Sequence, residues 1–112
     1  MYELVKTDGV EAAIAWFKAN GKRAAWGGSH WALAQQLISD GRIEDGLRLM
    51  ESDIEMTPKK VWLLRKTSRA FLDNGRPEQA LNFLQKGLEL RPDDESFNTM
   101  KAEAEKALED KI

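Results

Sequence analysis

The serines are the first residues to test for chemistry, because a serine becomes a nucleophile when a base activates it. One known arrangement places a lysine three residues after the serine. The chain has five serines, and the residues at that spacing are Ala32, Arg42, Glu55, Phe71 and Thr99. None of them is a lysine, so this kind of acyl-transfer site is absent.

The other reactive side chains are equally sparse. A single histidine, His30, supplies neither a metal cluster nor a catalytic triad, and we interpret it as a packed side chain at a helix start. Without cysteine, thiolate catalysis, disulfides and structural zinc are excluded. Gly27-Gly28-Ser29 lacks the preceding strand and following lysine of a phosphate-binding loop, so we interpret it as a flexible link with Ser29 as helix cap.

Carboxylates gather at 93–95 and at Asp40, Glu44 and Asp45. Paired carboxylates can act in acid–base catalysis. Both groups stand at predicted turns and helix starts, where the helix dipole favours negative charge. We therefore interpret them as structural, and we predict a protein that is not an enzyme and has no cofactor and no bound metal.

The charge is unevenly distributed along the chain. Residues 1–56 carry a net charge of -3, residues 57–76 carry +5, and residues 77–112 carry -4. Acidic flanks on both sides of the basic band argue against a continuous track for nucleic acid. No apolar stretch is long enough to span a membrane, and the first residues do not resemble a secretion signal. These features, with the absence of cysteine, favour a cytoplasmic setting.

The elements that position these residues follow a repeat of 34 residues. Gly41 and Gly75 are 34 residues apart, as are Pro58 and Pro92. A period of this length with two amphipathic runs per unit indicates a helical solenoid. We predict helices at 2–7, 9–20, 30–40, 43–56, 59–74, 77–90 and 94–110, an irregular segment at 21–29, and no sheet.

The spacing resembles the tetratricopeptide repeat, whose pattern places Trp, Leu, Gly and Tyr on the first helix and Ala, Phe and Pro further on. In the first full repeat these positions hold His30, Leu33, Ala34, Leu37, Gly46, Met50 and Pro58. In the second they hold Leu64, Thr67, Ser68, Phe71, Ala80, Leu84 and Pro92. Neither opening position is Trp, and Thr67 replaces the usual Leu, which predicts looser packing in the second repeat.

The resemblance implies an all-α, TPR-like α-solenoid of antiparallel helix pairs. We expect a single domain over 1–112, with a degenerate first repeat and linker at 1–29, repeats at 30–60 and 61–94, and a C-terminal capping helix at 95–112. The stretch 2–15, with the repeats after it, is also similar to tails that follow serine beta-lactamase-like hydrolase domains in bacterial proteins. In that case the chain is the accessory end of a larger, exported enzyme.

A groove is predicted where the first helices of successive pairs line the inner face of the repeat array. Helical angles place Trp62, Arg65 and Arg69 on this face, with Lys66 at its edge. Trp31 and Gln35 take the equivalent places in the preceding repeat. Aromatic residues beside arginines are typical of binding hot spots, and an acidic peptide or protein suits them.

Other interpretations of the same residues stay open. Arg69 can pair with Asp73 one turn on, and the indoles can complete helix packing. Trp16, Phe17 and Trp26 form a second candidate surface, for docking on a preceding domain or on a second copy of the chain. The predicted function is a non-catalytic protein–protein interaction scaffold, and single-stranded RNA binding through the basic band is the alternative.

Overall fold

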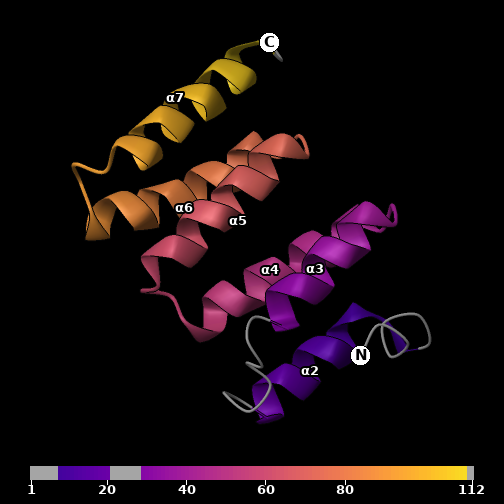
Figure 1. Cartoon of the computed structure of the whole chain (residues 1–112). Coiled ribbons are helices and arrows are strands. Elements are labelled where there is room, and N and C mark those ends of the chain that lie inside the picture. The colour runs from indigo at the N-terminus through magenta and orange to yellow at the C-terminus, as the bar shows by residue number, and fades with distance from the viewer. Residues whose placement is uncertain (1–7, 21–28, 111–112) are drawn as a thin grey trace. The chain divides into compact units, whose positions relative to one another are not determined.

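The computed structural model describes residues 8–20 and 29–110, and these form six helices with no strand (Figure 1). They are α2 (Val10–Asn20), α3 (Ser29–Ser39), α4 (Ile43–Met56), α5 (Val61–Asp73), α6 (Pro77–Leu90) and α7 (Glu95–Asp110). None of them is long and apolar enough to cross a membrane. The all-α prediction is confirmed, while the helix predicted at 2–7 and nearly all of the segment 21–29 lie outside the described residues.

The chain divides into two compact units, Met1–Met56 and Thr57–Ile112. In the first unit α3 pairs with α4, and α2 packs on α4. In the second unit α5 pairs with α6, and α7 packs on both of them, as the three neighbouring ribbons in Figure 1 show. The division lies close to the repeat boundary that the sequence predicts between residues 60 and 61.

The turns that join the helices of each pair are equivalent. Gly41 and Gly75 have φ angles of 87° and 76°, in the left-handed region that only glycine enters without strain. The amide of Arg42 donates to the carbonyl five residues before it at 2.8 Å, and the amide of Arg76 does the same at 2.8 Å. Three further amide–carbonyl pairs of each turn also recur at this spacing. The predicted equivalence of the two turns is confirmed.

Small residues let the paired helices approach closely. A Cβ atom on Gly46 would lie 2.6 Å from the carbonyl oxygen of Ala34 and 2.5 Å from Cγ1 of Ile38. Ser68 and Ala80, the counterparts in the second repeat, are both fully buried. The small pairs predicted from the repeat pattern therefore lie at helix–helix contacts.

The last helix, α7, has one buried face and one exposed face. Its buried residues are Phe97, Met100 and Ala104. The positions 98, 101, 102 and 105, which correspond to buried residues of α5, are exposed on α7. A polar outer face is what the end of a helical repeat requires, so α7 has the character of the predicted capping helix.

Thr67 is the weak point of the second repeat. Its side chain is fully buried, and its Oγ1 has no hydrogen-bond partner among the described residues. The neighbouring Ser68, by contrast, donates from Oγ to the carbonyl of Leu64 at 2.7 Å. An unsatisfied buried hydroxyl costs about 1–3 kcal/mol. Replacing the usual Leu thus leaves a polar defect in the core of this unit.

Candidate functional site

An open groove of about 640 Å³ lies between α5 and α7 in the second unit. It is lined by Arg65, Lys66 and Arg69 from α5 and by Glu95, Ser96, Thr99 and Met100 from α7. We call this the α5–α7 groove. Three of the residues that the sequence analysis placed in a binding groove come together here. The α7 side was missed, because a capping helix was expected only to cover the core.

Arg65 fastens the start of α7. Its Nη2 pairs with Oδ2 of Asp94 at 2.6 Å, and its Nε donates to Oγ of Ser96 at 2.9 Å. The guanidinium also stands over the ring of Phe97, 5.2 Å from its centroid. Asp94 in turn accepts the Phe97 amide at Oδ1 at 3.0 Å, which is how a helix N-cap satisfies an exposed donor. Arg65 is therefore a positioning residue for α7.

The hydrogen bond from the Phe97 amide lowers the pKa of Asp94, and the contacts with Arg65 lower it further. A lowered pKa means that the ionised carboxylate stabilises the folded state at neutral pH. That contribution is lost as the pH falls from about 4, the ordinary range of an aspartate, through the lowered pKa.

We expect Asp94→Asn to flatten the acid side of the stability profile. The amide oxygen of asparagine can still cap α7, but it carries no charge to be neutralised between pH 5 and pH 2. The melting temperature of the wild type and of the control Asp93→Asn should then fall more steeply with acid than that of Asp94→Asn. Parallel melting profiles, recorded by circular dichroism across this range, would contradict the role assigned to Asp94.

Arg69 forms exposed ion pairs at the other end of this face. Its Nη2 lies 2.7 Å from Oε2 of Glu103 and 3.0 Å from Oδ1 of Asp73, which confirms the predicted pairing one turn on. The hydrogen bond with Glu103 raises the pKa of Arg69 and lowers that of Glu103. Because both partners of the Arg69–Glu103 pair are 45% exposed, the pair stabilises the fold by less than about 1 kcal/mol.

Trp62 presents an indole that is 45% exposed. The Nζ atoms of Lys60 and Lys66 lie 5.5 Å and 5.4 Å from the ring centroid, within cation–π range. We call these three residues the Trp62 cluster. Lys66 belongs both to this cluster and to the α5–α7 groove, so it links the two. Lys60 was not singled out in the sequence because it precedes the first turn of α5.

The remaining predicted groove residues lie in the first unit. Trp31 is partly buried on α3, and Gln35 is exposed on the same helix. A shared groove of all six residues stays a prediction.

The second predicted surface is only partly exposed. Trp16 is 41% exposed and meets Phe17 edge to face, with the ring centroids 5.3 Å apart. Phe17 itself is 3% exposed, because α2 turns it into the core beside Ala13 and Ile14. Phe17 therefore supports Trp16 from below and presents no surface of its own. Trp26, the third member, lies outside the described residues.

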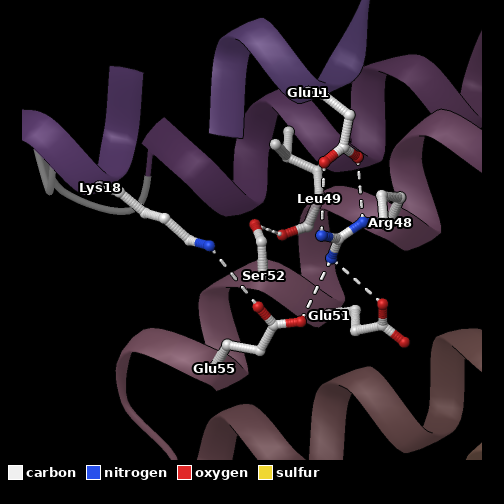
Figure 2. A network of polar contacts seen from close by, with 7 residues as sticks. All are labelled: Glu11, Lys18, Arg48, Leu49, Glu51, Ser52 and Glu55. Atoms are coloured by element: carbon white, nitrogen blue, oxygen red, sulfur yellow. Dashed lines mark hydrogen bonds and ion pairs between the residues drawn. The ribbon is translucent and has the colours of Figure 1, made fainter. Parts of the chain in front are cut away.

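A polar network ties α2 to α4 in the first unit (Figure 2). Arg48 lies 3.1 Å from Glu11 of α2 and 3.1 Å and 3.3 Å from Glu51 and Glu55 of its own helix. Lys18 reaches Glu55 at 3.8 Å. The partners at helical spacing could be read from the sequence, whereas Glu11, 37 residues away, could not. Since these groups neutralise one another, the network is structural.

The described residues hold no group of three or more histidine, cysteine, aspartate or glutamate side chains placed to bind a metal ion. The arrangement offers instead an open face with an exposed indole, cations, and carboxylates from the same unit. Such a face can contact another chain through side-chain exchange and packing.

A profile of the tetratricopeptide repeat matches residues 37–104, which is more than half of the chain. The chain belongs to the tetratricopeptide repeat family. The match runs from the second half of α3 into α7 and includes the α5–α7 groove and the Trp62 cluster. The helix α2 and the residues Trp31 and Gln35 lie outside it. No curated protein and no solved structure matches the chain.

Tetratricopeptide repeats generally mediate protein–protein interaction, and their family typically consists of non-catalytic scaffolds. This tetratricopeptide repeat protein therefore has the fold and the family of an interaction protein. Its attachment to a serine hydrolase stays a prediction.

Proposed function

We propose that this chain is a non-catalytic interaction module that binds a peptide or protein segment along the α5–α7 groove. The observation that carries the proposal is the lining of the groove, where basic side chains of α5 face polar and apolar side chains of α7. Such a lining offers a segment both charge pairing and contact area.

The ion pairs of the groove support exchange with a partner. The guanidinium of Arg69 and the carboxylate of Glu103 are both about half exposed, so separating them costs little. A carboxylate of the partner can replace Glu103 on Arg69 and gain a charge-assisted hydrogen bond in return. The buried Met100 and the exposed Thr99 provide the floor and the wall against which the segment packs.

The two arginines of the sequence prediction thus take different parts in the proposal. Arg69 contacts the partner, whereas Arg65 holds Asp94 and Ser96 and so keeps α7 in place beside α5. Replacing Arg65 changes the groove indirectly, through the position of α7. A loss of binding in an Arg65 variant therefore says little about direct contact.

A variant that fills the groove tests the proposal. Peptides are first selected on the purified chain from a random library displayed on phage, and their affinity is measured by fluorescence polarisation. Thr99→Trp places an indole in the groove without touching the core, because Thr99 is exposed. We expect it to weaken the selected peptides by about tenfold or more, which corresponds to about 1.4 kcal/mol.

The matched control is Asn82→Trp, which makes a similar change at an exposed position of α6 that lines no part of the groove. It should leave the affinity within about twofold of the wild type, because surface changes away from a contact have small effects. Equal affinities for Thr99→Trp and Asn82→Trp would locate the binding face elsewhere.

A further inference from the structure

Trp62 is exposed to an extent that packing does not explain. Among the described residues, the large hydrophobic side chains classed as exposed are Trp16, Trp62 and Leu90. Burying an aromatic side chain gains about 1.5–3 kcal/mol, so leaving an indole at the surface forgoes stability. Exposed aromatic residues are enriched where proteins contact partners, because the ring provides a large and rigid contact area.

The charge around this indole has one sign. The ammonium groups of Lys60 and Lys66 both lie within 5.5 Å of the ring centroid. The surrounding residues 57–76 carry six basic side chains and one acidic side chain. Any group that packs on the exposed ring therefore meets positive charge beside it.

The nearby arginines are committed to carboxylates of their own unit. Arg65 is held by Asp94 and Ser96, and Arg69 by Glu103 and Asp73. The lysines of the Trp62 cluster instead stand beside the indole, where a cation–π contact at an exposed site is worth about 0.5–1 kcal/mol. A contact of that strength gives way readily to a carboxylate, which binds an ammonium group more strongly.

We propose that the Trp62 cluster is the anchoring subsite of this protein for a short acidic segment with an apolar side chain. The apolar side chain packs on the indole of Trp62, and carboxylates on either side of it pair with Lys60 and Lys66. This inference rests on the proposed function, since Lys66 connects the cluster to the α5–α7 groove.

Charge separates an acidic peptide from single-stranded nucleic acid as the occupant. Glu95 lines the groove that continues from Lys66, and the flanking residues 1–56 and 77–112 carry net charges of -3 and -4. A polynucleotide extends several phosphates beyond the indole and meets these negative charges. A segment with two or three carboxylates is short enough to remain within the basic band.

Fluorine NMR on protein labelled with 5-fluorotryptophan tests the inference at the residue itself. The chain has four tryptophans, and the signal of Trp62 is identified by its loss in Trp62→Phe. The probe is a capped pentapeptide of alternating glutamate and leucine, and its neutral match has glutamine in place of glutamate. We expect the Trp62 signal to shift with the glutamate peptide and to stay in place with the glutamine peptide.

Charge reversal provides a second measurement. The double variant Lys60→Glu with Lys66→Glu should bind the glutamate peptide about tenfold or more weakly, because like charges then face each other. The control Lys86→Glu with Lys101→Glu makes the same change in net charge at exposed positions of α6 and α7. It should change the affinity by less than about threefold, since only long-range and screened interactions are altered.

Each contrary result overturns a defined part of the inference. Equal shifts with the two peptides would remove the recognition of charge. A shift with a pentauridylate but not with the glutamate peptide would replace the acidic peptide with nucleic acid. If Thr99→Trp abolishes peptide binding while the Trp62 signal never moves, the subsite is wrong and the proposed function stands. If Trp62 responds and Thr99→Trp has no effect, the groove is wrong and the subsite stands.

Discussion

Replacement of Phe97 by alanine is expected to lower the free energy of unfolding by about 3–5 kcal/mol, the usual cost of deleting a buried aromatic ring. Phe97 is fully buried at the contact of α7 with α6, where its ring would lie 2.6 Å from a Cβ atom on Gly87. Its opposite side supports the guanidinium of Arg65. No other residue of α7 combines burial of this size with a contact to both preceding helices of the unit.

Urea unfolding followed by circular dichroism gives the free energy, and hydrogen exchange shows where protection is lost. We expect the amides of α7 to exchange faster than those of α5 and α6, because the last helix is held from one side. Lys101→Ala, an exposed change on the same helix, serves as the control and should stay within about 0.5 kcal/mol of the wild type. A loss below 1 kcal/mol for Phe97→Ala would contradict the packing described for α7.

The second large effect is expected for Gly46→Ala. Alanine in a helix interior normally gains about 1 kcal/mol over glycine. Here the added Cβ atom meets the carbonyl oxygen of Ala34 at 2.6 Å, and a backbone atom cannot move aside as the end of a side chain can. We expect the overpacking, typically about 1–3 kcal/mol, to exceed the gain in propensity and to lower the melting temperature.

Gln36→Ala is the control for this change, because it adds helix propensity at an exposed position of α3 and creates no contact. Thermal unfolding of the two variants separates the two effects. If Gly46→Ala melts above the wild type, the helices α3 and α4 are farther apart than the structure places them.

Helix boundaries could be predicted where a single residue determines them. The bounds of α4 and α6 agree with the prediction, since Gly41 and Gly75 end the preceding helices and Pro77 occupies a first turn. The start of α5 was predicted two residues too early, at 59. The segment 57–60 forms a turn in which the Lys60 amide donates to the carbonyl of Thr57 at 3.3 Å.

The candidate site could be predicted only on one helix. Helical periodicity places Arg65, Lys66 and Arg69 on one face of α5, and these residues do line the same groove. Their partners could not be predicted, because Asp94 and Glu103 follow Arg65 and Arg69 at 29 and 34 residues and meet them only through the packing of α7. That packing turns Arg65 from an expected ligand contact into a support for α7.

The matching hydrogen bonds of the Gly41 and Gly75 turns also bear on how the chain can change length during evolution. Gain or loss of 34 residues between equivalent turn positions returns every turn amide to an equivalent carbonyl. An insertion of one residue within a helix instead rotates all later side chains by about 100° and carries the buried stripe out of the core. Descendants of this sequence should therefore differ in length by whole repeats, with shorter insertions confined to exposed turns.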